Sequence, residues 1–481
     1  MNIKQKTIQG VFWAAIQNWG SQAGSLLVFI ILARLLSPGD FGLVALANVI
    51  IIFTQVFVEQ GLAAALIQRP ELSSKYINTV FWTQIFLACV LTTITFISAS
   101  LLAEIFHQPQ LTSIIQWLSI LFVISALGHT QRALVKRKFN FQVLANAALL
   151  GIFLAGIVGI FMAFNGWGAW SLVGQQMTYE SVEVIVLWWA NSWRPKWQFS
   201  ETHLFEVLHF SINLLGEKLV VFFNQRTDQL LIGYFLGEVA LGYYAIAHRI
   251  LQVMTQLLIE TIIQVALPTL SRLQNDSQRF LDTLYRGTLF TSLIAFPVFL
   301  GVIILAPEIV TILFGEKWRE AIPILQILIF AGIIRAVSLF QRAAYVAMGK
   351  PSLQFKLGLL NAIFNLIACL LAVKWGILAV AMAYVLSDYL VFPIGQWLLT
   401  KVIAISWKTY LSQFLAPITC TIIMTLMIFI TQYLVTPLVP PQINLLICSM
   451  IGSISYILAL KLIFPQLFSQ LLTLATLLRS S

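Results

Sequence analysis

Residues 143–164 read VLANAALLGIFLAGIVGIFMAF, a run of 22 residues that contains no charged side chain. A helix needs roughly 20 predominantly apolar residues to cross the hydrocarbon core of a bilayer, so this run has the length and composition of a membrane span. Similar runs follow one another along the chain, with short polar breaks between them. The sequence therefore predicts an integral membrane protein that crosses the bilayer many times.

The composition of the whole chain agrees with this prediction. Of the 481 residues, 59% are hydrophobic and 10% are charged, whereas a soluble domain carries about 25% charged residues. No hydrophilic segment is long enough for a fused kinase, nucleotide-hydrolysing or glycosyltransferase domain. The first apolar stretch, from Ile8 past Ile31, is too long for the core of a signal peptide, so we expect it to be a retained span.

Turn residues and charge clusters divide the apolar runs into fourteen predicted spans. The predicted spans are 9–33, 41–67, 77–103, 112–131, 143–164, 167–190, 207–236, 240–268, 287–314, 321–348, 355–373, 376–400, 410–432 and 442–463. We predict an all-α protein in three parts. Residues 1–198 form a lobe of spans 1–6, residues 199–403 a second lobe of spans 7–12, and residues 404–481 hold spans 13–14 and a short cytoplasmic tail.

The basic residues give the orientation of these spans. Of the 28 lysines and arginines, 19 fall on the side of the N-terminus, four on the opposite side and five within spans. Positive residues accumulate in cytoplasmic loops, so both termini are predicted to be cytoplasmic, in a bacterial plasma (inner) membrane. Because the basic residues are scattered rather than gathered in one patch, nucleic acid is not expected as a partner.

Two parts of the chain resemble each other. Phe41-Gly42 matches Leu241-Gly242 at an offset of 200, and Gln131-Arg132-Ala133 matches Gln341-Arg342-Ala343 at an offset of 210. An even number of spans separates the copies, so the two lobes are predicted to have the same orientation. Parallel repeats with a site at their interface are a recurrent plan among transporters.

Several predicted spans carry polar residues at helical spacing. Members of such stripes recur every three or four positions, which places them on one face of a helix. The stripes are Asn18, Ser21, Gln22 and Ser25 in the first span; Asn48, Gln55 and Glu59 in the second; Gln176, Glu180 and Glu183 in the sixth; Asn213, Glu217, Asn224 and Asp228 in the seventh; Arg249, Gln252, Gln256, Glu260 and Gln264 in the eighth; and Arg335, Ser338 and Arg342 in the tenth. Such residues usually face a bundle interior or an aqueous cavity, and we expect a water-filled cavity between the lobes.

The basic members of these stripes are candidates for binding an anionic group, because the planar fork of arginine donates two parallel hydrogen bonds to phosphate. The predicted substrate-binding residues are Arg249, Arg335, Arg342, Arg226, Asn18, Gln22, Gln252 and Gln256. Some of the basic groups have an alternative structural role. Internal pairing is the favoured interpretation for Arg226 and Lys218, and Arg342 has the alternative of reaching lipid headgroups.

Four acidic residues are candidates for coupling transport to an ion. Glu59, Glu260, Asp228 and Asp388 lie within predicted spans, where a carboxyl group in a partly dry cavity can take up and release a proton. The expected ion is H⁺ or Na⁺, which would be transported rather than held as a cofactor. The alternative role for each acid is that of a counter-ion to a cavity arginine.

Neither catalytic nor metal-binding patterns are found, so no cofactor, metal site or enzymatic activity is expected. The five histidines lack ligand-like spacing, and the sequence contains no nucleophile elbow or phosphate loop. The four cysteines (Cys89, Cys369, Cys420 and Cys448) lie in apolar stretches and are expected to be small buried residues.

The segments between spans resemble a known family. The turn Leu32-Ala33-Arg34-Leu35-Leu36-Ser37-Pro38-Gly39-Asp40-Phe41-Gly42 is similar to the first outer turn of bacterial polysaccharide transport proteins. Further similarity lies in the segments 228–237, 241–244 and 313–318. These proteins are the Wzx-type flippases of the multidrug/oligosaccharidyl-lipid/polysaccharide exporter superfamily. The resemblance covers residues 1 to about 400, and the last two spans match only in hydrophobicity.

The resemblance implies a flippase that exports undecaprenyl-pyrophosphate-linked oligosaccharide repeat units by ion-coupled alternating access. On this hypothesis the arginines hold the pyrophosphate, the cavity takes the sugars, and the lipid tail stays in the bilayer. The expected partners are the lipid-linked oligosaccharide, the phospholipid bilayer, and a polysaccharide polymerase with its chain-length machinery.

Three other functions are weaker fits. Peptidoglycan-precursor flippases carry several arginines in their first spans, and this chain lacks them there. Multidrug exporters of the superfamily usually have twelve spans and an acidic residue in the first, whereas the first span here carries no charge before Arg34. A membrane-bound polysaccharide polymerase or ligase would need a large outer loop with catalytic residues, and every predicted outer loop is short.

Overall fold

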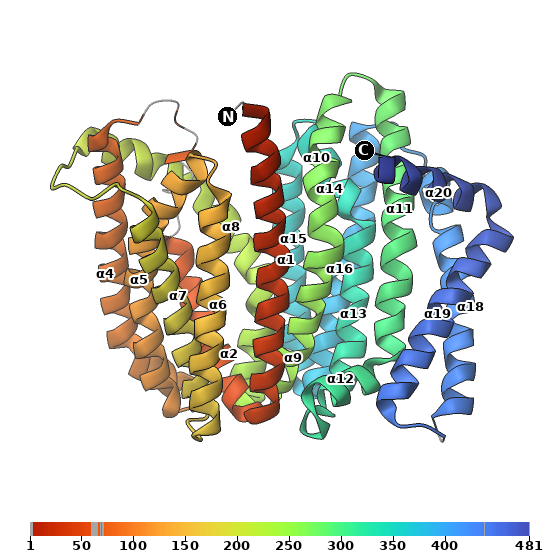
Figure 1. The fold of residues 1–481 in the computed structure, drawn as a ribbon, viewed down its shortest axis with the longest axis horizontal. Helices are drawn as coiled ribbons and strands as arrows, with labels where there is room; N and C mark the ends of the chain where they lie inside the picture. The colour runs from red at the N-terminus through yellow and green to blue at the C-terminus, as the bar shows by residue number, and fades with distance from the viewer. Residues whose placement is uncertain (1–2, 59–65, 68, 70–71, 437, 481) are drawn as a thin grey trace. The chain divides into compact units, whose positions relative to one another are not determined.

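The computed structural model of this chain describes residues 3–58, 66–67, 69, 72–436 and 438–480. The regular structure of these residues is helical, and within each part of the chain the long helices run roughly parallel to one another (Figure 1). The predicted all-α class is therefore confirmed.

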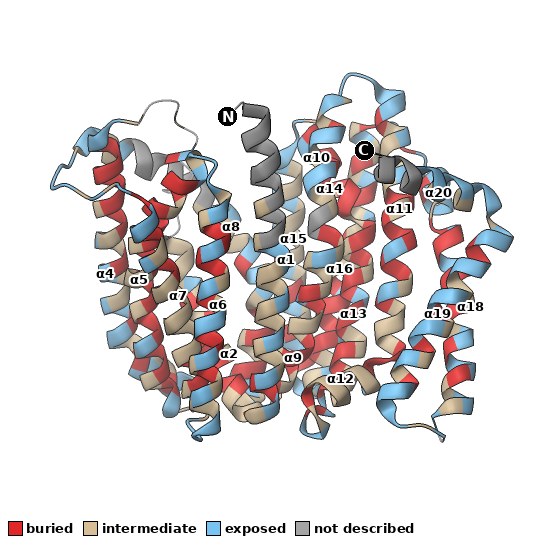
Figure 2. Ribbon diagram, in the orientation of Figure 1, coloured by how far each residue is buried: buried red, intermediate tan, exposed pale blue. Residues whose placement is uncertain are grey.

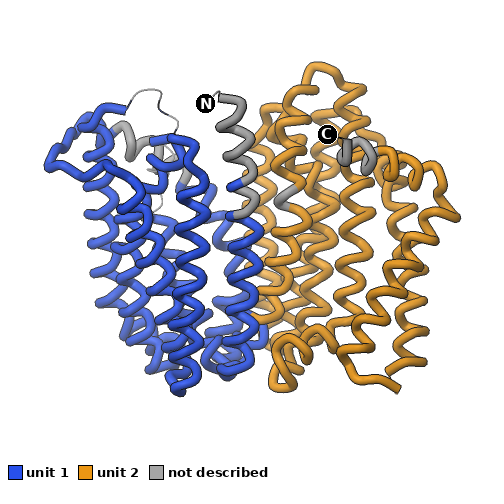
Figure 3. The backbone as a smooth tube through the Cα atoms, in the orientation of Figure 1, with its two compact units in different colours: residues 1–245 blue, residues 246–481 orange. Residues whose placement is uncertain are grey.

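The chain forms two compact units, residues 1–245 and 246–481, which Figure 3 colours separately. Unit 1 contains α1 (Ile3–Leu35), α2 (Pro38–Val58), α4 (Ser74–Ile105), α5 (Gln110–Arg137), α6 (Phe141–Phe164), α7 (Trp170–Ala190), α8 (Glu201–Phe235) and the first part of α9 (Gly237–Thr255). Helix α8 packs on α2 and α4 of its own unit. The three-part division at residues 198 and 403 stays a prediction.

Unit 2 begins within α9 and contains the remaining helices. These are a π-helical turn (Gln256–Glu260), α10 (Thr261–Arg272), α11 (Ser277–Ile304), α12 (Ala306–Phe314), α13 (Ala321–Val337), α14 (Leu339–Ala347), α15 (Pro351–Ala372), α16 (Ile377–Val402), α17 (Trp407–Ser412), α18 (Leu415–Val435), α19 (Pro441–Ile463) and α20 (Pro465–Ser480), with short 3₁₀ turns at Glu316–Trp318 and Val373–Trp375.

Over the residues that the structure describes, which leave out 59–65 of the second predicted span, each of the fourteen predicted spans corresponds to one helix or to consecutive helices. Within the described residues, eleven helical segments are long and apolar enough to cross a membrane. The other three predicted spans are α1, α7 and α8, all of which carry polar stripes. The predicted spans 240–268, 287–314, 321–348 and 410–432 are each divided between successive helices.

Local sequence explains where several helices begin. Ser37 and Asp40 form a reciprocal cap at the start of α2, in which the Ser37 amide donates to Asp40 Oδ2 at 2.9 Å and the Asp40 amide donates to Ser37 Oγ at 3.2 Å. Ser73 caps α4 by accepting a hydrogen bond from the Tyr76 amide, and Asp276 caps α11 in the same way from the Arg279 amide.

Helix α6, which contains the run 143–164, has one face of small buried residues and another of large exposed residues. Its buried residues include Ala145, Ala147, Ala148, Gly151, Ala155, Gly156 and Gly159. Large side chains such as Phe153 and Phe161 are exposed. Small residues let neighbouring helices approach closely, as they do in membrane bundles, and the exposed apolar side chains suit contact with lipid. Figure 2 shows exposed and buried positions alternating along the helices.

The starts of α2 and α9 meet in a reciprocal contact of their backbones. A Cβ atom on Gly42 would lie 1.7 Å from the carbonyl oxygen of Glu238, and one on Gly242 would lie 1.9 Å from that of Pro38. Positions 42 and 242, like positions 38 and 238, are related by the offset of 200 noted in the sequence. Only glycine at both positions allows the two backbones to approach so closely.

Polar contacts attach the final helices of unit 2. Glu308 of α12 accepts hydrogen bonds at Oε1 from Gln432 of α18 at 3.1 Å and from Asn444 of α19 at 3.0 Å. The residues of the predicted cytoplasmic tail are largely helical, since α20 follows α19 directly; their cytoplasmic location stays a prediction. Phe464, Leu467, Phe468 and Leu471 pack against a core cluster of α11, α18 and α19.

Candidate functional site

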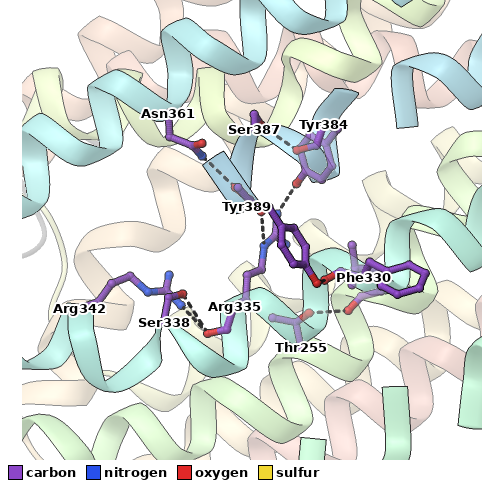
Figure 4. A network of polar contacts seen from close by, with 11 residues as sticks. Thr255, Phe330, Arg335, Ser338, Arg342, Asn361, Tyr384, Ser387 and Tyr389 are labelled. Carbon is purple, nitrogen blue, oxygen red and sulfur yellow. Dashed lines mark hydrogen bonds and ion pairs between the residues drawn. The ribbon is translucent and has the colours of Figure 1, made fainter. Parts of the chain in front are cut away.

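In unit 2 the structure gathers Arg335, Arg342 and Asp388 into one polar network. Figure 4 shows this network and labels the two arginines. The Nε atom of Arg335, on α13, lies 3.4 Å from Oδ2 of Asp388 on α16. The same guanidinium also donates to the hydroxyl of Tyr384, one turn before Asp388. Arginine and acid are therefore paired, as the alternative counter-ion role for Asp388 requires.

Further hydrogen bonds fix the two ends of this pair. Asn361 of α15 donates to Asp388 Oδ1 at 2.9 Å. Arg342 of α14 donates from Nη2 to the backbone carbonyl of Arg335 at 3.3 Å. The side chains of Arg335 and Asp388 are 25% and 17% exposed, so the pair is accessible from one side rather than sealed in the core. An incoming anion can therefore compete with Asp388 for the Arg335 fork.

The polar stripe of α9 begins beside this network. His248 lies with its ring centroid 6.4 Å from that of Tyr384. The next residue, Arg249, donates from Nη1 to Gln252 Oε1 at 3.4 Å. Gln256 starts the π-helical turn, where the regular helical hydrogen bonding changes. Such turns are frequent at functional sites.

The remaining described candidates lie in unit 1. Arg226 donates to Gln229 Oε1 at 3.1 Å within α8. Asp228 is fully buried and accepts a hydrogen bond from the hydroxyl of Tyr244 on α9, also fully buried. Asn18 is exposed on α1, and Gln22, one turn later, is half-buried. The structure thus separates the candidates into a group in unit 2 and a group in unit 1.

Two of the ion-coupling candidates cannot be placed. Glu59 lies outside the described residues, as does the side chain of Glu260. The roles of the described candidates, Asp228 and Asp388, stay predictions.

One ion pair of unit 1 was missed by the sequence interpretation. Arg132 of α5 lies 2.8 Å from Glu183 of α7, measured from Nη2 to Oε1, and its Nε lies 3.1 Å from the same oxygen. The predicted fourth span ended at residue 131, which placed Arg132 in a cytoplasmic loop, whereas α5 continues to Arg137. The polar stripe of the sixth span, with Glu180 and Glu183, was the available signal that a basic partner lay opposite.

The cysteine prediction needs one correction. Cys369, Cys420 and Cys448 are buried, but Cys89 is exposed on α4. An apolar stretch around a cysteine does not show whether the cysteine lies on the side of the helix that packs on protein or on the side that suits contact with lipid.

Comparison with known families identifies relatives of the whole chain. The sequence model of a family described as polysaccharide biosynthesis protein matches residues 31–323. The teichuronic acid biosynthesis protein TuaB of Bacillus subtilis (strain 168) is 24% identical over 476 residues, covering 98% of each chain. The succinoglycan biosynthesis transport protein ExoT of Rhizobium meliloti is 24% identical and covers 98% of this chain and 96% of its own. The lipopolysaccharide biosynthesis protein WzxC of Escherichia coli K12 is also 24% identical, covering 87% and 86%.

Solved structures share the fold. The lipid II flippase MurJ, in an inward closed conformation, superposes with a TM-score of 0.78 at 16% identity, covering 95% of this chain and 99% of its own. An inward-facing multidrug resistance transporter of the MATE family superposes with a TM-score of 0.60 at 16% identity, covering 82% and 98%. Both similarities concern the fold alone. The chain thus has the fold of a membrane transporter.

Proposed function

This chain belongs to the polysaccharide biosynthesis protein family, and we propose that it is a flippase for a lipid-linked oligosaccharide. The cargo is an undecaprenyl-pyrophosphate-linked repeat unit, which moves from the inner to the outer leaflet of a bacterial plasma membrane. The observation that carries this proposal is the similarity to TuaB and ExoT over 98% of the chain. The name of TuaB refers to teichuronic acid biosynthesis, and that of ExoT to succinoglycan biosynthesis and transport.

The comparison of folds supports a flippase over a drug exporter. The lipid II flippase aligns with 95% of this chain and the MATE transporter with 82%. The additional aligned length favours a protein with helices beyond the twelve of a drug exporter. A polymerase or ligase is disfavoured because the relatives compared above include transporters, and we propose that the protein moves its cargo without altering it chemically.

The network of Arg335 supplies the proposed contact for the pyrophosphate. The guanidinium is held by Asp388 and Tyr384, which orient its fork before any cargo arrives. A pyrophosphate carries more negative charge than one carboxylate, so it competes well for the same donors. The proposal has three further parts. Transport is coupled to H⁺ or Na⁺, both termini are cytoplasmic, and the protein cooperates with a polysaccharide polymerase and its chain-length machinery.

Deleting the gene in its own bacterium tests the function. We expect loss of one surface polysaccharide together with accumulation of its lipid-linked repeat unit on the cytoplasmic side. The wild-type gene should restore export, and Arg335→Ala should not. Arg279→Ala serves as the matched control, because Arg279 forms an exposed surface pair with Asp276. Unchanged polysaccharide with new sensitivity to cationic drugs would instead indicate a drug exporter.

A further inference from the structure

The pair formed by Arg132 and Glu183 is not used by the mechanism proposed above. Both Nε and Nη2 of Arg132 point to one carboxylate oxygen, at 3.1 and 2.8 Å. Within the part of the chain that the structure describes, Glu183 is the hydrogen-bond partner of this guanidinium. The second terminal nitrogen, Nη1, is not needed for this contact, so part of the arginine fork is available to another acceptor.

The two members of the pair differ in exposure. The Arg132 side chain is 26% exposed, and the Glu183 side chain is 7% exposed. The guanidinium is therefore the more accessible member of the pair. A ligand that reaches the pair contacts Arg132 more readily than Glu183, and it must be an anion to compete with Glu183.

Neighbouring basic residues have a different role, which sets Arg132 apart. Lys138 donates to Asn191 Oδ1 at 3.1 Å. Arg194 donates to the carbonyl of Asn191 at 2.6 Å. These residues tie chain segments to neutral oxygens, whereas Arg132 is held by a carboxylate, which an anionic ligand can replace charge for charge.

The surroundings of the pair are rich in charge. His129 lies one turn before Arg132 on α5, and the charges of both Arg132 and Lys218 of α8 act on it. Tyr179 and Glu180 of α7 lie within electrostatic reach of Arg132. Three helices thus direct titratable side chains to one region of unit 1. Groups of this kind are unusual inside membrane helices unless they serve a site.

Unit 2 holds a similar pair. Arg132–Glu183 joins α5 and α7, the helices of the fourth and sixth predicted spans, and Arg335–Asp388 joins α13 and α16, which belong to the tenth and twelfth. The helices are equivalent in the repeat, whereas the residue that matches Arg132 is Arg342. The two pairs lie at different depths in their own helices. Arg132 is five residues before the end of α5 and Arg335 twelve before the end of α14. At 1.5 Å per residue these are about 8 and about 18 Å from the predicted cytoplasmic ends.

We propose that Arg132 is a loading subsite, which binds the diphosphate headgroup of the cargo near the cytoplasmic side before Arg335 does. In the absence of cargo, Arg132 is paired with Glu183. This inference rests on the proposed function. Binding transfers the Arg132 fork from Glu183 to a phosphate oxygen. The cargo is thereby held by two arginines in succession, each released from an acid of the same unit.

Removing both charges of the pair separates this proposal from a structural role. The double variant Arg132→Met with Glu183→Gln leaves neither member of the pair as an unpaired buried charge, and such replacements are often neutral or stabilising. Its folding is checked by thermal unfolding of the purified protein in detergent. Binding of farnesyl diphosphate is measured for wild type, the double variant and Glu183→Gln alone. Arg279→Met with Asp276→Asn is the matched control at an exposed pair.

We expect the double variant to unfold at the wild-type temperature, to bind farnesyl diphosphate at least tenfold more weakly, and to export no polymer. Glu183→Gln alone should bind the probe more tightly, because the internal competitor is gone. Wild-type binding and export by the double variant would show that the pair is only structural and would overturn the proposal. That result leaves the flippase function intact, since the deletion strain tests it separately.

Discussion

Arg335 meets its partners through more than one N–H group of its guanidinium. Nε faces Asp388 at 3.4 Å while another nitrogen donates to Tyr384, and the guanidinium carbon lies 5.5 Å from the centre of the tyrosine ring. Lysine keeps the charge but presents a single ammonium group, which cannot reproduce this fork. We expect Arg335→Lys to insert normally and to lower export about tenfold or more. The amount of surface polymer in a complemented deletion strain, corrected for protein level, measures this; export within twofold of wild type would contradict it.

Tyr244 forms a buried contact with Asp228, the residue for which the sequence suggested ion coupling. Both side chains are fully buried, and the tyrosine hydroxyl donates to Oδ2 of the aspartate. Removing a donor from a buried carboxylate costs about 1.5–3 kcal/mol. We therefore expect Tyr244→Phe to lower the unfolding temperature of the purified protein, with half-buried Tyr243→Phe as the adjacent control. Adding Asp228→Asn should recover part of the loss, and strict additivity of the two changes would contradict a direct contact.

At the scale of the element, the crossing of α2 and α9 depends on two glycines. The Cβ atom of Gly42→Ala would lie 1.7 Å from a backbone oxygen, and that of Gly242→Ala would lie 1.9 Å from another, so the helix starts must move apart. Overpacking of this kind costs about 1–3 kcal/mol. We expect each substitution to lower the unfolding temperature and reduce export, as measured on the purified protein and in the complemented strain.

Gly216 provides the control for this prediction. It lies within α8 of the same unit, and a Cβ atom there would meet nothing within 4 Å. Gly216→Ala should raise stability slightly, because alanine is the better helix former by about 1 kcal/mol. Equal effects of Gly42→Ala and Gly216→Ala would mean that the close approach at Gly42 has no energetic consequence.

The sequence predicted the elements well and the contacts between them poorly. Length and hydrophobicity mark α6 and α19 to within two residues at each end, because a span must match the thickness of the bilayer. The end of α5 was misplaced, since a basic cluster at its last turn looks the same in a loop as in a helix. The pair Arg132–Glu183 joins residues 51 positions apart, and only the packing of α5 on α7 brings them together. Exposure of Cys89 depends in the same way on which face of α4 meets protein.

For the whole molecule, the last helices are attached to unit 2 by polar as well as apolar contacts. Glu308 binds Gln432 and Asn444, and Asn444 also donates to Thr436 Oγ1 at 3.2 Å. A carboxylate that links three helices fixes their register more specifically than apolar packing does. The sequence resemblance covered these helices only in hydrophobicity, so their attachment to unit 2 could not be predicted from it.

The orientation of the molecule can be tested across a single helix. Lys350 and Lys374 are exposed residues on either side of α15, with Lys350 on the predicted cytoplasmic side. After the four native cysteines have been replaced, Lys374→Cys should react with a membrane-impermeant maleimide added to intact cells, and Lys350→Cys should react only after permeabilisation. The reason is the excess of basic residues predicted for the inner side. Labelling of both positions from outside would mean that α15 does not cross the bilayer and that the count of fourteen fails. Reversed labelling would keep the count, place both termini outside and reverse the predicted order in which Arg132 and Arg335 meet the cargo.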